Sequence, residues 1–186
     1  LTFSQRDFMS YSLGVYLVDQ NQISRVVNSK DSDLFNKLKE HFLAEHDEED
    51  WEEEEFNVKA GLEHLVFGGP ISEEDLHMVG YGLEYLCQFV GGEMMDTDRF
   101  TSIHYDYLEK VKCVLPLVNR GAPFSTTSWD NFPYVGYLTQ DECKKLNEKT
   151  EVLECPDYGI LLARNDFYKW VDAATNLSKD LIGFYY

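Results

Sequence analysis

Two histidines next to a run of carboxylates suggest a metal site. His41 and His46 stand beside the acidic residues 47–50 (DEED), and imidazole together with carboxylate suits zinc, nickel or manganese. The two histidines are five positions apart, so they lie on different faces of any helix, and the chain has neither an HExxH motif nor a calcium loop with its required glycine. We therefore expect a solvated acidic face here, with no metal and no cofactor.

The cysteines raise thiol chemistry, which needs a base close to the nucleophile. They are Cys87, Cys113, Cys143 and Cys155. No CxxC pair is present to bind zinc or exchange disulfides. In the fold, Cys87 or Cys155 could meet a histidine at position 64, 77 or 104, but no local signature supports such a pair. We expect reduced, partly buried thiols.

Other catalytic motifs are missing from the sequence. It has no GxSxG, no GxxxxGK phosphate loop and no GxGxxG after a strand, so serine hydrolase, P-loop and dinucleotide-binding functions lack their usual support. Carboxylates are so abundant that a glycosidase-type pair cannot be singled out. No catalytic residue is therefore assigned, and a binding protein is favoured over an enzyme.

A long loop is predicted from Asn119 to Pro133, and its aromatic residues offer a candidate binding surface. Trp129, Asp130 and Phe132 combine aromatic area with hydrogen-bonding groups, as ligand grooves and partner surfaces do. Packing of the rings onto the core is the alternative. A small-molecule site or an unrecognised enzyme would lie near residues 124–134.

The run from Ala44 to Phe56 (AEHDEEDWEEEEF) is the most acidic part of the chain. It holds nine Asp or Glu and no Lys or Arg, and so accounts for half of the net charge of -18. A basic protein partner, a divalent cation or solubility alone could explain it. Its candidate binding residues are Asp47, Glu48, Glu49, Asp50, Trp51, Glu52 and Glu53.

The overall charge excludes two classes of partner. Binding along a phosphate backbone depends on clustered Lys and Arg, so no nucleic acid is expected, and the same negative field disfavours anionic membranes. No window approaches the roughly 20 apolar residues that span a bilayer, and the LTFSQRDF start lacks the apolar centre of a signal peptide. These features predict a cytoplasmic protein.

The hydrophobic pattern predicts an α+β fold, with several helices packed on a small sheet. Residues 13–18, 134–138 and 181–185 are rich in β-branched and aromatic side chains and predict strands. Helical spacing predicts helices near 23–27, 34–42, 52–67, 72–90, 103–115, 140–149 and 160–176. Pairing of the first and last strands would bring both ends of the chain into one sheet.

The chain is short enough for a single domain. Met9 opens the first strand region, so we expect residues 1–8 to be an extension and residues 9–186 to form one globular domain. The sequence does not indicate an oligomeric state.

Segments along the chain resemble a family of uncharacterised bacterial domains. They are residues 9–19 (MSYSLGVYLVD), 29–31 (SKD), 62–70, 81–87, 130–139 (DNFPYVGYLT) and 181–186 (LIGFYY). Residues 136–142 (GYLTQDE) are also faintly similar to the YfbM-like proteins. The resemblance implies a bacterial cytosolic domain, and neither family brings known catalytic residues. The leading hypothesis, which the acidic run alone motivates, is a non-enzymatic binding or regulatory protein, of an immunity-like kind, whose acidic surface binds a basic protein.

Overall fold

The computed structural model describes residues 11–45, 58–124, 132–148 and 157–186. Its strands are β1 (Leu13–Val18), β2 (Glu93–Met94), β3 (Tyr134–Leu138) and β4 (Asp180–Tyr185). Its helices are α1 (Gln20–Val26), α2 (Ser32–Glu45), α4 (Val58–Phe67), α5 (Met78–Phe89), the 3-10 turn η2 (Asp98–Phe100), α6 (Tyr105–Val111), α7 (Pro116–Asn119), α8 (Gln140–Glu148) and α9 (Tyr158–Leu177). This confirms the predicted α+β class.

The strands form one antiparallel sheet in the order β2-β1-β4-β3. β1 and β4 pair along their whole length, from Leu13 opposite Tyr185 to Val18 opposite Asp180. The first and last strands are therefore neighbours, as the sequence predicts. β2 adds a short strand within residues 93–99 (EMMDTDR), whose polar composition predicts a loop.

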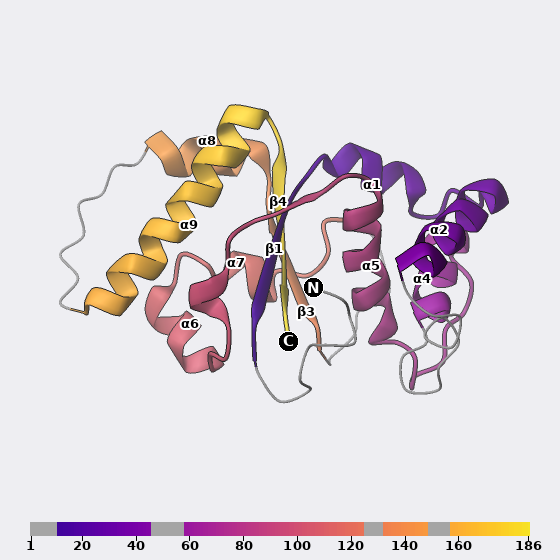
Figure 1. Cartoon of the computed structure of the whole chain (residues 1–186), viewed down its shortest axis with the longest axis horizontal. Helices are drawn as coiled ribbons and strands as arrows, with labels where there is room; N and C mark the ends of the chain where they lie inside the picture. The colour runs from indigo at the N-terminus through magenta and orange to yellow at the C-terminus, as the bar shows by residue number, and fades with distance from the viewer. Residues whose placement is uncertain (1–10, 46–57, 125–131, 149–156) are drawn as a thin grey trace.

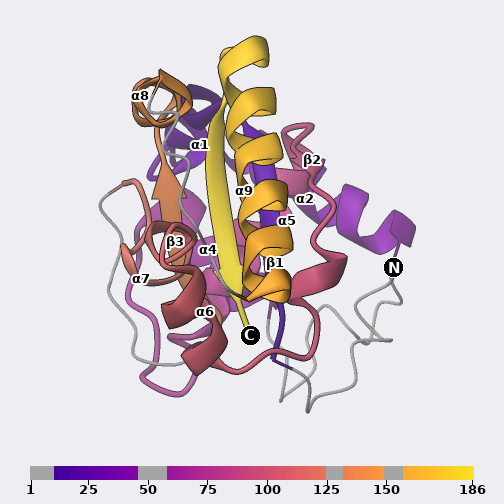
Figure 2. The same cartoon turned by 90° about the vertical axis from the view of Figure 1, so that its left-hand side faces the viewer.

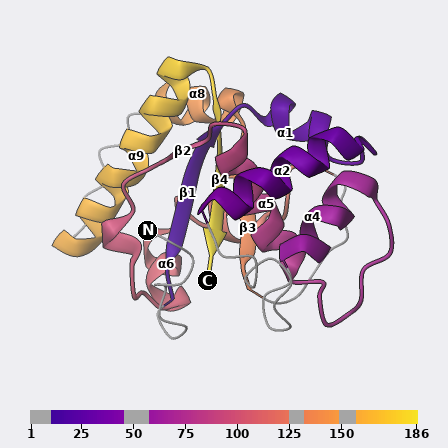
Figure 3. The ribbon, with the colours of Figure 1, turned by 45° about the vertical axis from the view of Figure 1, so that its right-hand side comes forward.

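Helices cover both faces of the sheet (Figure 1). One layer contains α6, α7 and α9, and the view in Figure 2 shows α9 running alongside β4. The opposite layer contains α2, α4 and α5, which come forward in Figure 3. Successive side chains of β1 point to opposite faces of the sheet and so pack against both helix layers. Val15 and Leu17 pack on the α9 side, while Tyr16 and Val18 pack on the α5 side. None of the described helices is long and apolar enough to cross a membrane.

Glycines allow α4 and α5 to approach each other closely. A Cβ at Gly61 would lie 2.0 Å from the carbonyl oxygen of Met78, and one at Gly82 would lie 3.0 Å from the carbonyl carbon of Gly61. Glycine within a helix lowers helix propensity and so predicts a close backbone approach, and Gly82 of α5 confirms it. Leu83, Leu86 and other residues of the predicted apolar stripe on α5 are buried.

Two predicted helices have different bounds in the structure. The helix expected from Ser72 begins only at Met78, because the chain before it forms turns that close hydrogen bonds between residues three apart, as from Met78 N to Asp75 O. The helix expected over 103–115 is split, because Lys112 takes a positive φ of 47° and ends α6. Pro116 then opens α7, where its missing N–H costs nothing.

Candidate functional site

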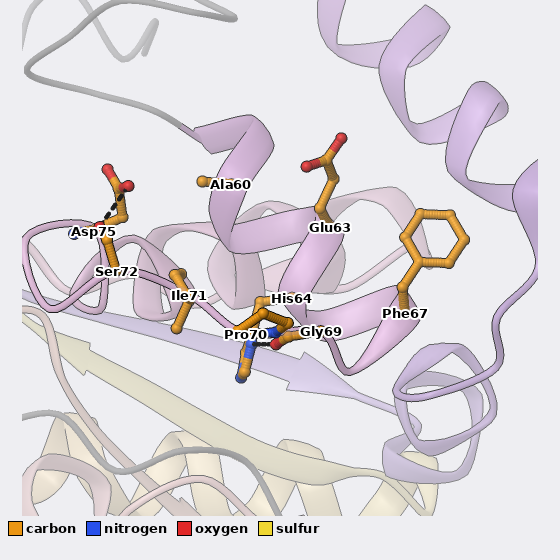
Figure 4. A pocket seen from close by; sticks show the side chains of 9 residues that line it. All are labelled: Ala60, Glu63, His64, Phe67, Gly69, Pro70, Ile71, Ser72 and Asp75. Carbon is orange, nitrogen blue, oxygen red and sulfur yellow. Dashed lines mark hydrogen bonds between the residues drawn. The ribbon is translucent and has the colours of Figure 1, made fainter.

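A surface hollow of about 270 Å³ lies between α4 and the segment that leads into α5. Figure 4 shows it with its lining side chains. They are Ala60, Glu63, His64, Phe67, Gly69, Pro70, Ile71, Ser72 and Asp75. α4 ends at Phe67, and Gly68 follows with a positive φ of 68°, which turns the chain back over the helix. The hollow is thus built by one helix end and the turn after it.

His64 fixes the turn that closes one side of the hollow. Its Nδ1 lies 2.7 Å from the carbonyl oxygen of Gly69. A carbonyl only accepts hydrogen bonds, so Nδ1 carries the hydrogen and donates it. The imidazole therefore holds the Gly69–Pro70 turn against α4.

The acidic side chains that line the hollow are Glu63 and Asp75. Asp75 accepts a 2.7 Å hydrogen bond from the Ser72 hydroxyl, and that hydroxyl in turn accepts one from the backbone N–H of Asp75. Among the described residues, no Lys or Arg forms an ion pair with Glu63 or Asp75. The lining residues include neither Lys nor Arg. Such a site favours a cation and repels anions.

Most of the binding residues proposed from the sequence lie outside the described part of the chain. These are Asp47, Glu48, Glu49, Asp50, Trp51, Glu52, Glu53, Trp129 and Asp130. Phe132 is described, and its ring packs against Tyr11, Tyr134 and Tyr185 at centroid distances of 5.8, 4.8 and 5.8 Å. Tyr11 and Tyr134 keep 39% and 38% of their surface exposed. Phe132 thus joins a partly exposed aromatic cluster at one end of the sheet.

A buried acid on α5 is the polar feature that the sequence analysis missed. Glu84 is 1% exposed, and its carboxylate accepts hydrogen bonds from the hydroxyls of Tyr16 and Tyr186. Gln88 donates to the Tyr16 hydroxyl at 2.9 Å. The sequence did hold a signal for this buried acid. Glu84 is three positions after Tyr81 and four before Gln88, so these polar side chains share one helix face beside the apolar residues.

The hydrogen bonds of Glu84 connect α5 to the sheet. Tyr16 comes from β1 and Tyr186 follows β4, so one carboxylate connects three elements. A buried carboxylate is tolerated only when its oxygens are hydrogen-bonded, and here both are. This arrangement explains the buried Glu84 by a structural role, without a catalytic one.

The described cysteines are poor nucleophiles. Burial, followed by the charge of Glu84, raises the pKa of Cys87 well above its usual value. Burial raises the pKa of Cys143 to about 12 and that of Cys113 to about 11. Thiolates are the reactive form, so thiol catalysis at these three positions is disfavoured. Cys155 lies outside the described residues.

The part of the chain that the structure describes shows no cluster of metal-ligating side chains. Within it, no three or more His, Cys, Asp or Glu side chains gather where they could hold an ion. His41 instead packs its ring against Tyr85 and Phe89, at 5.8 and 5.5 Å. His46 lies outside the described residues.

Comparison with known proteins identifies a family and no characterised relative. Neither the curated proteins nor the solved structures contain a match to this chain. One family model, described as a domain of unknown function (DUF7691), matches residues 9–186. The bacterial origin and the YfbM-like similarity stay predictions. Because the match spans most of the sequence, the chain belongs to the DUF7691 family.

Proposed function

We propose that this protein is a non-enzymatic binding protein that takes a basic polypeptide through its acidic surface, in a regulatory or immunity-like role. One observation carries the proposal. Glu63 and Asp75 line a surface hollow, and no described Lys or Arg pairs with either of them. Carboxylates that no internal Lys or Arg neutralises are available to an external cation.

The position of the hollow along the chain supports the same reading. The acidic run ends at Phe56, and α4 begins at Val58. The net charge of -18 would also steer a basic partner during diffusional encounter. In this proposal the run supplies long-range attraction, while the hollow supplies a shaped contact.

A titration with a fluorescent peptide tests the proposal. The peptide alternates Arg and Ser, and a matched peptide alternates Glu and Ser. We expect the full chain to bind the basic peptide and not the acidic one. In a second protein, each Asp of residues 47–55 is changed to Ser and each Glu to Gln. This variant should bind the basic peptide at least about tenfold more weakly. Equal affinity of the two proteins for the basic peptide would refute the acidic surface as the binding element.

A small-molecule site or unrecognised enzyme near residues 124–134 is the second candidate. The observation that favours it is the contact of Phe132 with the partly exposed rings of Tyr11 and Tyr134. Aromatic residues of this kind are enriched at binding hot spots. A ligand screen followed by tryptophan fluorescence would test it, since Trp129 is close in sequence to Phe132. A hit whose binding survives Phe132→Ala would not support this candidate.

A further inference from the structure

The size of the hollow beside α4 restricts what can occupy it. Pockets for drug-sized ligands and cofactors usually enclose roughly 300–1,000 Å³, and this one encloses about 270 Å³. It also lies at the surface, between a helix end and a turn (Figure 4). A group the size of one amino-acid side chain fits these dimensions better than a nucleotide or a flavin.

The lining chemistry selects a cation with an apolar stem. Glu63 and Asp75 contribute negative charge, and the lining holds no Lys or Arg to balance it. The hydrogen on His64 Nδ1 is already donated to the Gly69 carbonyl, so it is not offered to a ligand. Pro70 and Ile71 add apolar surface to the same hollow.

An aromatic ring and carboxylates together favour guanidinium over ammonium. A guanidinium is planar and weakly hydrated, it stacks on flat surfaces, and it donates several hydrogen bonds to carboxylates. Phe67 brings an aromatic ring to the lining, and Glu63 and Asp75 bring acceptors. We propose that the hollow is a subsite for a single arginine side chain of the basic partner, an inference that rests on the proposed function.

Small probes test the subsite apart from the peptide. n-Butylguanidinium represents the arginine side chain, n-butylammonium represents lysine, and 1-butanol represents the stem alone. Each is titrated into the isotope-labelled full chain while the backbone amide signals of Gly69, Ile71 and Ser72 are followed by NMR. We expect saturable shifts with butylguanidinium, with a dissociation constant on the order of 1 mM, weaker binding of butylammonium and no saturation with butanol.

Paired variants link the shifts to the two carboxylates. Glu63→Gln with Asp75→Asn should weaken butylguanidinium binding about fivefold. The control is Glu109→Gln with Glu148→Gln, which removes the same charge at two exposed sites on α6 and α8 and should leave binding unchanged. Unchanged binding in the hollow variant, absence of saturable shifts, or equal affinity for butylammonium would overturn the arginine subsite.

The same variants separate this inference from the function on which it rests. If the basic peptide binds the wild type and the hollow variant equally, but loses affinity when residues 47–55 are neutralised, the arginine subsite is wrong and the proposed function stands. If neutralising residues 47–55 leaves peptide affinity unchanged, the proposed function fails, whatever the small probes do.

Discussion

The Tyr16 hydroxyl donates a 2.9 Å hydrogen bond to Oε1 of Glu84, which lies 68 positions later in the sequence. The bond crosses from the central strand β1 to α5, in the core on the α5 side of the sheet. Removing a donor from a buried carboxylate weakens its solvation while the charge stays buried, and this costs more than the bond itself contributes.

Tyr16→Phe should therefore lower the free energy of unfolding by about 1–3 kcal/mol, measured by urea denaturation at neutral pH. Tyr158→Phe is the matched control, because Tyr158 is 72% exposed. It should change the free energy by less than about 0.5 kcal/mol. If the two variants were equally stable, Glu84 would not depend on the Tyr16 hydroxyl.

Gly61→Ala should destabilise the protein, although alanine favours helix. The added Cβ would lie 2.0 Å from the Met78 carbonyl oxygen, so α4 and α5 must separate. We expect a loss of about 1–3 kcal/mol or more on thermal or urea unfolding. Gly69→Ala is the control, since a Cβ there meets no atom within 4 Å. A stabilising Gly61→Ala would contradict the close packing of the two helices.

The ion pair of Arg120 and Glu142 predicts a pH-dependent stability. The hydrogen bond from Arg120 lowers the pKa of Glu142, and hydrogen bonds from Thr139 act in the same direction. A carboxyl group whose pKa is lower in the folded state stabilises the fold above its unfolded pKa of about 4.3, and this contribution is lost as the pH falls through the folded pKa.

Glu142→Gln keeps a side chain that can complete the capping box with Thr139, so it isolates the charge. At pH 7 the variant should be less stable than the wild type by less than about 1 kcal/mol, because both partners are partly exposed to solvent. The difference should shrink as the pH falls below about 4. A difference that stayed constant down to low pH would argue against the charge.

Thiol labelling tests the unreactive state of the described cysteines. In a Cys155→Ser variant, Cys87, Cys113 and Cys143 are the remaining thiols. Their raised pKa values predict slow reaction with a disulfide reagent at pH 8 in the native protein, and reaction of all three after denaturation. Rapid labelling of Cys113, the least buried of them, would show that its surroundings are more open than in the structure.

Local sequence signals predicted the elements that depend on local contacts. Thr139 followed by Glu142 three residues later predicts a capping box at a helix start, and the box forms, with the Thr139 N–H donating to Glu142 at 2.9 Å and α8 following directly. Strand β3 occupies the predicted residues 134–138. The capping box is formed by neighbours in sequence, and the β-branched and aromatic residues of β3 are a local strand signal, although the strand itself pairs with the distant β4.

Other features that depend on distant partners were not predicted, although the pairing of β1 with β4 was. The two residues of β2 form a strand only because β1 lies beside them, and α6 ends at Lys112 without a local breaker residue. The apolar pattern of the predicted helix 160–176 places Leu161 on its buried face, but Leu161 is 36% exposed in the structure. The hollow at His64 was missed for the same reason, since its lining comes together only when the chain turns back after Gly68.

The salt dependence of peptide binding tests the central claim most directly. Affinity for the Arg and Ser peptide is measured as ionic strength rises from about 50 mM to about 200 mM, a range over which the screening length falls by about half, to about 7 Å. We predict a steep loss of affinity in the wild type and a shallow one after neutralisation of residues 47–55. Parallel salt curves for the two proteins would contradict an acidic binding surface.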